Sequence, residues 1–515
     1  MEIQFWSKLL ASVAVVGILG LLFRLYNAVV AHPRRLRSAL RKQGLSGPPP
    51  TFLLGNILEM KRARDAAAKT ATVNGPPSSH HCGPILLPFF DQWRKQYGDV
   101  FMFALGNTQI VHVTQPEMVR EITICTSLDL GKPTYQAKER GSLLGQGILT
   151  SNGPQWVHQR KILAPQLYME KVKGMINLIQ DSTMALVNSW KKIVEAEGGL
   201  ADIKIDQYMR SFSGDVISRA CFGSNYSKGE EIFLRLRALQ EAASKKLLAT
   251  GIPGLRHLPT KSNREEWALE KEIKKLILNV VKERKGAGFE KDLLQMVLQG
   301  AENGELSQDA IDGFVVDNCK NIYLAGYETT AVAATWCLML LASHPQWQQR
   351  IRAEVLHICN GHIPDAQMIR KMKLLTMVIN ESLRLYPPVS VVSREALKDM
   401  KFGDINVPKG VNVWTLVTTL HTDPDIWGSD SYQFNPDRFA NGITGACKFP
   451  HLYMPFGVGP RVCLGQNLAL VELKILISLI VSRFSFILSP KYVHSPALKL
   501  VIEPGHGVNL LIREL

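Results

Sequence analysis

The sequence FGVGPRVCLG at residues 456–465 decides how the chain is interpreted, because it places one cysteine in a glycine-rich loop. An apolar helical run, residues 466–480, follows directly. A helix N-terminus and backbone N–H groups turned toward the sulfur stabilise a thiolate, the form of cysteine that binds a metal. The glycines permit a tight turn and the close approach of a flat ring. Cys463 is therefore a candidate metal ligand, and the alternative is an ordinary buried cysteine beside a glycine turn.

Two charged side chains precede this loop on a predicted helix, residues 374–386. Glu381 and Arg384 are three residues apart, so they share one helix face. Alone, the pair is weak evidence, because an exposed ion pair within a helix has the same pattern. The sequence YPP follows at once, and FNPDRF, which contains Arg438, lies between this helix and the cysteine loop. The combination favours a structural charge cluster.

The sequence AGYETT at residues 325–330 lies midway along a helical pattern that covers residues 307–343. Such a helix is about 50 Å long at 1.5 Å per residue, enough to cross a whole domain. Gly326 allows close approach and a local widening of the helix, and the Thr329 hydroxyl can bond a preceding carbonyl. The alternative for Thr329 is an ordinary threonine inside a helix.

The sequence WVHQR at residues 156–160 follows the turn SNGP and begins another predicted helix. Arg160 can make a charge-assisted hydrogen bond to a carboxylate, and Trp156 can donate from its indole N–H. Arg394 and Arg461 are further candidates to bind carboxylates, although a surface salt bridge remains the alternative for Arg394.

These motifs, in this order, resemble those of the cytochrome P450 family, and the resemblance covers essentially the whole chain. The cysteine segment matches the family's Phe-x-x-Gly-x-Arg-x-Cys-x-Gly signature at every fixed position. The resemblance implies a mostly α fold with a small β region: a large helical domain plus a small sheet domain, preceded by one N-terminal transmembrane helix. Two residues depart from the family pattern. Tyr327 stands where close plant relatives often have histidine, and Leu167 replaces a usual phenylalanine.

The resemblance also implies the cofactor, haem b, with Cys463 as the axial ligand of its iron. The residues that it assigns to haem binding are Trp156, Arg160, Arg394, Phe456 and Arg461. The residues that it assigns to oxygen activation and proton supply are Gly326, Glu328 and Thr329. Glu381, Arg384 and Arg438 are expected to form a buried charge cluster that braces the cysteine loop.

The implied activity is that of a haem-thiolate monooxygenase, which inserts one oxygen atom from O2 into an apolar small molecule by hydroxylation or epoxidation. Electrons are expected from NADPH through a flavoprotein reductase. Residues 146–148 and 318–323 resemble the plant clan that oxidises terpenoids, and most of all its gibberellin-oxidising branch. Two alternatives stay open: a haem-thiolate isomerase or lyase acting on a peroxide, and a catalytically silent haem-binding scaffold.

The N-terminus is predicted to anchor the chain in a membrane. Residues 9–23 are uncharged and apolar, and with flanking Lys8 and Arg24 able to snorkel, the span extends over about residues 5–31. A cleaved signal peptide is the alternative, but no clear cleavage site precedes the basic run that follows. Because positive charge follows the span, we expect a single-pass protein of the endoplasmic reticulum with its catalytic domain on the cytosolic side.

The predicted domain organisation follows from these segments. Residues 1–31 form the anchor, residues 32–50 a basic and proline-rich hinge, and residues 51–515 the catalytic domain. Within the last, residues 61–83 are rich in Ala, Ser and basic residues and are predicted to be a flexible surface insertion. Strands are expected near residues 100–114, 389–413 and 498–512.

Composition narrows the function further. Hydrophobic residues make up 46% of the chain and charged residues 20%, which describes a globular protein. The net charge of +15 is spread over mixed-sign helices with no nucleic-acid module, so we expect no nucleic-acid partner. Eight scattered cysteines do not form a disulfide framework. Lys161, Lys448 and Lys474 surround the cysteine loop in the predicted fold and are candidates for docking an acidic reductase.

Overall fold

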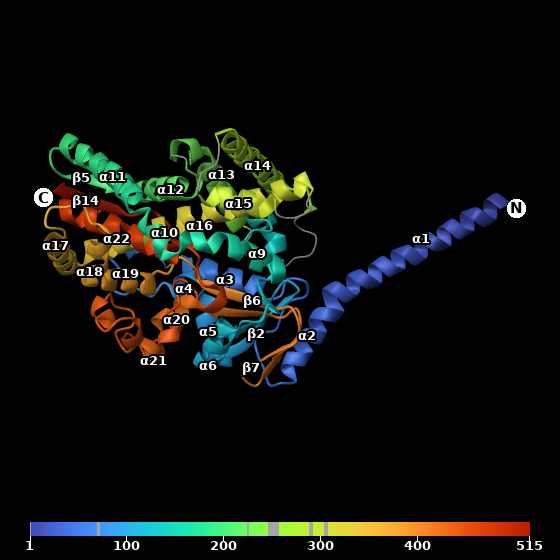
Figure 1. Ribbon diagram of the computed structural model, residues 1–515. Coiled ribbons are helices and arrows are strands. Elements are labelled where there is room, and N and C mark those ends of the chain that lie inside the picture. The colour runs from blue at the N-terminus through green and yellow to red at the C-terminus, as the bar shows by residue number, and fades with distance from the viewer. Residues whose placement is uncertain (1, 69–72, 224–225, 246–256, 288–291, 303–306) are drawn as a thin grey trace.

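A computed structural model describes residues 2–68, 73–223, 226–245, 257–287, 292–302 and 307–515. Helices form most of one large part, and a smaller part contains the largest sheet with short helices on it (Figure 1). This is the predicted fold: mostly α, with a helical domain and a small sheet domain. One further helix projects from the body at the N-terminus (Figure 1).

The helical part is built around α16 (Gln308–Ser343). Its 36 residues span about 54 Å, and the Ser307 side chain caps its first turn by accepting from the backbone N–H of Ala310. Almost every residue from 330 to 342 is buried, because neighbouring helices cover it on several sides. The helices in contact with α16 include α12 (Asp206–Phe222), α15 (Leu293–Glu302), α19 (Lys373–Leu385) and α22 (Gln466–Arg483).

The other helices complete this shell or connect it to the sheets. In the helical part they are α7 (Thr134–Glu139), α8 (Gly141–Leu144), α9 (Gly153–Leu163), α10 (Met169–Lys173), α11 (Ile176–Ala196), α13 (Tyr226–Lys245), α14 (Lys261–Ala287), α17 (Pro345–Cys359) and α18 (Ala366–Lys371). Beside the sheet and before the cysteine loop they are α3 (Ile57–Ala68), α4 (Gly83–Leu86), α5 (Pro88–Tyr97), α6 (Pro116–Ile124), α20 (Val417–Thr422) and α21 (Pro424–Trp427).

The largest sheet has five strands in the order β2-β3-β9-β6-β4. Only β3 and β9 pair in parallel. An aromatic cluster of α5 and β2, which includes Phe90, Trp93, Phe101 and Phe103, forms a separate core against this sheet. The strands are β2 (Val100–Leu105), β3 (Thr108–Val113), β4 (Leu130–Gly131), β6 (Val391–Ala396) and β9 (Asn412–Leu416).

The C-terminal residues form two small sheets that contact the helical part. One has the order β10-β14-β5, and the hairpin β12-β13 packs on α16. Trp336 of α16 donates its indole N–H to the carbonyl of Ile502 at 2.9 Å, which fixes the hairpin to the central helix. The strands are β5 (Ala201–Lys204), β10 (Phe484–Leu488), β12 (Pro496–Lys499), β13 (Val501–Pro504) and β14 (Asn509–Glu514), with a separate pair β7 (Met400–Phe402) and β8 (Ile405–Val407).

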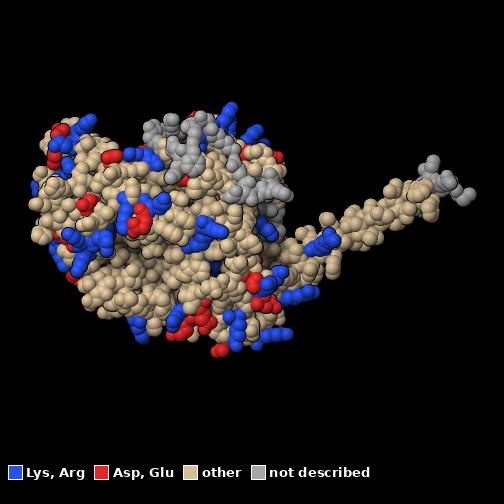
Figure 2. All heavy atoms as spheres, viewed as in Figure 1, with Lys and Arg blue, Asp and Glu red and all other residues tan. Residues whose placement is uncertain are grey.

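The N-terminal segment is one continuous helix in three parts: α1 (Glu2–Tyr26), a π-helical turn (Asn27–Ala31) and α2 (His32–Arg41). It is long and apolar enough to cross a membrane, and its apolar window is not buried in the body. Figure 2 shows this projecting helix almost free of charged side chains, whereas Lys, Arg, Asp and Glu intermingle on the body. α16 also has the length and composition of a membrane span, but it is mostly buried.

The predicted hinge over residues 32–50 needs a correction. Its basic first part continues the helix as α2 and packs on the body, with Pro33, Arg37 and Leu40 buried. The Arg37 guanidinium donates to the carbonyl of Pro48 at 2.8 Å, which ties the proline-rich part to α2. The helix ends before the prolines at residues 48–50, and residues 45–50 form no helix, so the correction concerns only the basic part, whose amphipathic helix face meets the sheet domain.

Residues 61–83, predicted to be a flexible surface insertion, lie at the surface up to residue 79 in the part that the structure describes, but the segment also pairs and packs with distant elements. The segment continues α3 to Ala68 and then forms β1 (Val73–Asn74), which pairs with β11 (Val493–His494). His80 and Cys82 are buried, and His80 Nδ1 lies 2.9 Å from the hydroxyl of Tyr386. Residues 69–72 lie outside the described residues. The buried contacts are confined to the end of the segment, and composition does not reveal them.

Candidate active site

The cysteine loop begins after Met454 and ends at the first residue of α22. Cys463 donates its backbone N–H to the carbonyl of Phe456 at 2.8 Å, which closes the loop into a tight turn. Gly459 has φ +76°, and a Cβ there would lie 2.1 Å from the carbonyl oxygen of Thr123. Only glycine fits that approach to α6. The motif therefore folds as its glycines predict.

The Cys463 sulfur faces a cavity of about 510 Å³ that Trp156, Arg160 and Leu464 also line. The thiol keeps accessible surface because it lines this cavity, which is partly open to solvent beside the exposed residues Lys161 and Tyr168. Burial raises its pKa, while hydrogen bonds from the backbone N–H groups of Gly465 and Gln466 and the charge of Arg160 lower it. The net shift of the thiol pKa is upward, so the N–H groups at the start of α22 act on the sulfur in the predicted direction without outweighing burial.

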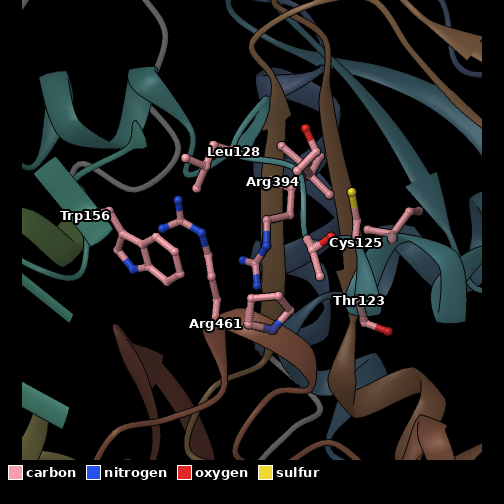
Figure 3. Close-up of a pocket in the computed structure, with 11 residues that line it drawn as sticks. Thr123, Cys125, Leu128, Trp156, Arg394 and Arg461 are labelled. Atoms are coloured by element: carbon pink, nitrogen blue, oxygen red, sulfur yellow. The ribbon is translucent and has the colours of Figure 1, made fainter. Parts of the chain in front are cut away.

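Three cations gather near this cavity, of which Arg394 is buried and the other two are partly exposed. Arg394 and Arg461 line a smaller cavity of about 20 Å³ with Trp156, and Figure 3 shows their guanidinium groups close together with the Trp156 indole facing Arg461. The Arg461 guanidinium lies 4.2 Å from the centre of that ring. Lys132 is the third cation, and sequence reasoning missed it, because a lysine before a proline carries no motif. Asn152 accepts from both the Arg461 guanidinium, at 3.1 Å, and the Lys132 backbone N–H.

The charges of these cations are not balanced by the protein. Burial lowers the pKa of Arg394 to about 10, and burial together with the charges of Arg394 and Arg160 lowers that of Arg461 to about 10. Burial and the charges of Arg394 and Arg461 hold the pKa of Lys132 well below its usual value. Among the residues that the structure describes, no Asp or Glu forms an ion pair with any of the three. A cluster of this kind needs an anionic ligand, and the two carboxylates of haem b fit it.

The structure places Arg160 differently from the other predicted haem ligands. It donates to the carbonyl of Val462 at 3.1 Å, so it contacts the cysteine loop directly. Its guanidinium also lies 5.6 Å from the centre of the Trp156 ring. The indole is therefore flanked by Arg160 and Arg461, on the wall that the two cavities share.

Glu381, Arg384 and Arg438 meet as expected, in a cluster whose first two members are fully buried. Arg384 donates two hydrogen bonds to the Glu381 carboxylate, both at 2.7 Å. Arg438 Nε lies 3.6 Å from Glu381, and its Nη2 lies 2.6 Å from Asp430. This is a paired and hydrogen-bonded network, the form in which buried charge is tolerated.

His421 connects this cluster to the cysteine loop, and no sequence motif indicated it. Its backbone carbonyl accepts from Arg384 at 2.8 Å, and its Nε2 accepts from the backbone N–H of Met454 at 2.9 Å. Burial and the charge of Arg384 lower the pKa of His421 to about 3, so the ring stays neutral and can accept that bond. The expected bracing of the loop thus acts through an imidazole.

The AGYETT segment lies at the centre of α16. The Thr329 hydroxyl donates to the carbonyl of Ala325 at 2.7 Å, as the sequence predicted. The two residues share one helix face, and both keep some accessible surface. Tyr327 points elsewhere, since it is buried and its ring stacks on Phe233 of α13 at 4.7 Å.

Gly326 makes the close approach that the sequence predicted, and the approach is to a neighbouring helix. A Cβ at Gly326 would lie 2.5 Å from the side chain of Ile217 on α12. Ser213 of the same helix donates to the Gly326 carbonyl at 2.7 Å. Gly326 therefore allows α12 and α16 to pack closely. The spacing of residues along the sequence could not predict that Gly326 faces α12, because this depends on which helix packs against that side of α16.

Glu328 is 1% exposed and lies among charged side chains from other elements. Its Oε2 accepts from Arg237 of α13 at 3.0 Å and lies 3.5 Å from Arg210 of α12. Burial raises its pKa, Arg210 and Arg237 lower it, and the charge of Glu503 raises it again, so that the net shift is upward. Arg210, Arg237 and Glu503 were missed, because they are isolated in sequence.

A helical domain around a cavity with one thiol at a helix N-terminus, beside unbalanced cations, defines a haem-thiolate protein. A family model described as cytochrome P450 matches residues 79–506. The chain therefore belongs to the cytochrome P450 family of haem monooxygenases. The resemblance inferred from the cysteine motif is confirmed.

Its relatives are plant proteins that match along the whole chain. Cytochrome P450 714C2 of Oryza sativa subsp. japonica is 52% identical and covers 99% of both chains. Cytochrome P450 714B3 of Zea mays is 46% identical over 99% of this chain and 96% of its own. Cytochrome P450 714A2 of Arabidopsis thaliana is 45% identical over 96% of each. The predicted plant type is thereby confirmed.

The position of Gly326 generates a prediction. Replacing Gly326 by Ala should lower the free energy of unfolding by about 1–3 kcal/mol, because the added methyl group overpacks the contact with Ile217. Chemical denaturation of the purified protein measures this change. The matched control is Gly313→Ala in the same helix, where a Cβ meets nothing within 4 Å and alanine should stabilise the helix by up to about 1 kcal/mol. Equal stability of the two variants would show that Gly326 is not a packing residue.

Proposed function

We propose that this chain is a membrane-anchored monooxygenase that takes electrons from NADPH through a flavoprotein reductase and hydroxylates or epoxidises an apolar small molecule. The observation that carries the proposal is the Cys463 thiol, which lies at the start of α22 and faces a cavity of about 510 Å³. Membership in the cytochrome P450 family supports the monooxygenase reaction.

The residues around the cavity fit haem b. Cys463 is the proposed axial ligand, with Phe456 in its loop, and Arg394 and Arg461 beside Trp156 are the proposed partners of the propionates. When bound, thiolate-ligated haem iron activates dioxygen, because the thiolate donates electron density that favours cleavage of the O–O bond. The protein would supply the ligand and the charge balance.

Protons are the other requirement, and the proposed donors are on α16. The Thr329 hydroxyl donates to Ala325, so its oxygen lone pairs remain able to accept a hydrogen bond and to hold a proton in transit. Glu328 is the adjacent acid, and its raised pKa favours a protonated carboxyl. We assign Thr329 to positioning the proton and Glu328 to its supply.

A diterpenoid, and within that class a gibberellin, is the proposed substrate. The support is the resemblance of residues 146–148 and 318–323 to the terpenoid-oxidising plant clan. In the structure these two stretches contact each other: Asn318 accepts from the backbone N–H of Ile148 at 3.2 Å, and Asn321 accepts from that of Leu149 at 2.8 Å. These hydrogen bonds connect α16 to the loop before α9.

The proposed location is the endoplasmic reticulum membrane, with a single span and the catalytic domain in the cytosol. The helix that includes α1 supports the span. Arg24, Arg34 and Arg35 at its inner end support the orientation, since positive charge stays on the cytosolic side.

Microsomes that contain this protein and a plant reductase should add one oxygen atom to a diterpenoid acid. A panel of such acids, analysed by mass spectrometry, tests the reaction and the substrate class together. The control variant Cys463→Ala should lose the red-shifted Soret band of the reduced carbon monoxide complex, because no other cysteine begins a helix at this cavity among the described residues. A variant that keeps the band would rule out Cys463 as the ligand.

Replacing Thr329 by Ala should leave the haem content unchanged and divert electrons to hydrogen peroxide, since the hydroxyl is assigned to protons. The measurement is product formed per NADPH consumed. Thr335→Ala is the matched control, because Thr335 makes the same hydroxyl bond one and a half turns later, to Ala331 at 2.8 Å. A ratio that falls equally in both variants would reduce Thr329 to a helix-stabilising residue.

The reductase is proposed to dock where the cavity beside Cys463 opens, and Lys161 is the best placed of the three predicted lysines. It is exposed and lines that cavity. Lys448 lies 5.3 Å from the centre of the Phe449 ring. Lys474 points inward, since it donates to the carbonyl of Ile369 at 3.1 Å and burial lowers its pKa. Its predicted docking role is therefore replaced by a structural one.

The variant Lys161→Glu should slow reduction by the reductase without changing substrate binding. The difference from the unmodified protein should shrink as salt rises, because the Debye length falls from about 10 Å at 0.1 M to about 3 Å at 1 M. Stopped-flow reduction at several salt concentrations measures this. Lys401→Glu, an exposed lysine on β7, is the control. An equal rate for both variants would place the docking surface elsewhere.

A further inference from the structure

Two acids and two arginines from four different elements form a buried charge cluster beside Thr329. Glu328 belongs to α16, Arg210 to α12, Arg237 to α13, and Glu503 to β13 of the C-terminal hairpin. Both carboxylates are at most 3% exposed, and the guanidinium groups are at most 17% exposed. The four charges are therefore mutually dependent in a poorly solvated site.

The hydrogen bonds in this cluster are shared unequally. Glu503 accepts two from Arg237, at 2.8 and 2.9 Å, and one from Arg210 at 2.8 Å. Glu328 accepts only one, from Arg237 at 3.0 Å, and the contact with Arg210 is longer, at 3.5 Å. Its other oxygen, Oε1, is buried and has no hydrogen-bond partner among the described residues. Glu503 therefore accepts most of the hydrogen bonds that the two arginines donate, and Glu328 accepts only one.

The hairpin that carries Glu503 is itself fixed to both neighbouring helices. Gln240 of α13 donates to the carbonyl of Lys499 at 2.8 Å, and Trp336 of α16 donates to that of Ile502 at 2.9 Å. Lys499 adds a half-exposed ion pair to Glu503 at 3.0 Å. The position of the Glu503 carboxylate is therefore set by the hairpin, independently of Glu328.

We propose that Glu503 is a positioning residue for the proposed proton donor: by occupying the two arginines, it keeps Glu328 from forming a closed ion pair with them. This rests on the proposed role of Glu328. Glu503 acts only through Arg237 and Arg210 and touches neither substrate nor haem. It ties proton supply to the docking of α13 on the C-terminal hairpin.

The electrostatics of the two acids agree with this division. Burial raises the pKa of Glu503, but the hydrogen bond and charge of Arg237, with Arg210, leave the pKa below its usual value. Burial also raises the pKa of Glu328, and there the opposing arginines do not reverse it. The charged groups that face the cluster from every packed element are Asp206 and Arg210 on α12, Arg237 and Glu241 on α13, and Lys499 and Glu503 on the hairpin.

The test is the variant Glu503→Gln in the full-length enzyme. Removing this anion should let both arginines close on Glu328, which lowers its pKa and leaves it ionised. At a fixed pH above the pKa of Glu328, the protonated fraction should then fall about tenfold for each unit by which that pKa decreases. Infrared spectra of the ferric enzyme without substrate, recorded against pH, should lose the protonated carboxyl band that Glu328→Gln also removes. Product per NADPH should fall with it, and the solvent isotope effect should rise.

Two comparisons separate this role from a structural one. Glu241→Gln removes a half-exposed carboxylate that accepts from the same Arg237 at 3.2 Å, and it should change neither the band nor the coupling. Glu503→Asp should retain both. If the Glu503→Gln variant does not bind haem, a double variant that combines Glu503→Gln with Arg210→Gln keeps the charges balanced and is used in its place. The same loss of the band is expected.

The outcomes also separate this inference from the proposed function. A Glu328 band that titrates identically with and without Glu503 overturns the positioning role, whatever the coupling does. If Glu328→Gln itself leaves product per NADPH unchanged, the proposed donor is wrong, and the inference fails with it. Loss of the band in Glu503→Gln together with lower coupling supports both.

Discussion

The buried pair of Glu381 and Arg384 is the interaction on which the site depends. Two 2.7 Å hydrogen bonds satisfy the carboxylate, and the remaining guanidinium N–H groups reach the backbone between His421 and Gln433. Because His421 in turn accepts from Met454, the start of the cysteine loop is fixed by an ion pair in another helix. Removing one partner leaves an uncompensated buried charge, which costs about 3–5 kcal/mol in comparable sites. The position of the cysteine loop is therefore fixed by this ion pair.

Some cations of the molecule are paired with an acidic side chain, and others have only neutral partners. The second kind marks the place where an anionic cofactor fits. Around Glu381 and around Glu503, every buried cation has an acidic partner within the protein. The cations that line the smaller cavity, Arg394 and Arg461, have neutral partners only, the Ser393 and Ser151 carbonyls and Asn152. Folding them without a carboxylate is costly, so the site is completed by an anionic ligand. Charge balance thus separates binding residues from structural ones without reference to a motif.

Sequence reasoning succeeded where the information is local. Cys463 before an apolar helix, and Glu381 with Arg384 on one face, are set by spacing along a single element, so their positions could be predicted. The long helix around Thr329 was predicted from its apolar pattern, with the hydroxyl bond to the preceding turn. It failed where a residue acts through a partner far away in sequence. His421 and Glu503 carry no motif, and only the fold brings them to the site.

The packing of α2 means that the folded body begins at this helix, before the proline-rich segment and not after it. Leu40 is fully buried and Arg37 nearly so, against strands β3 and β8. The N-terminal helix is therefore continuous with the body, and the two cannot swivel freely about the proline-rich segment. In the proposed membrane anchoring, a change in the tilt of this helix would turn the whole body with it.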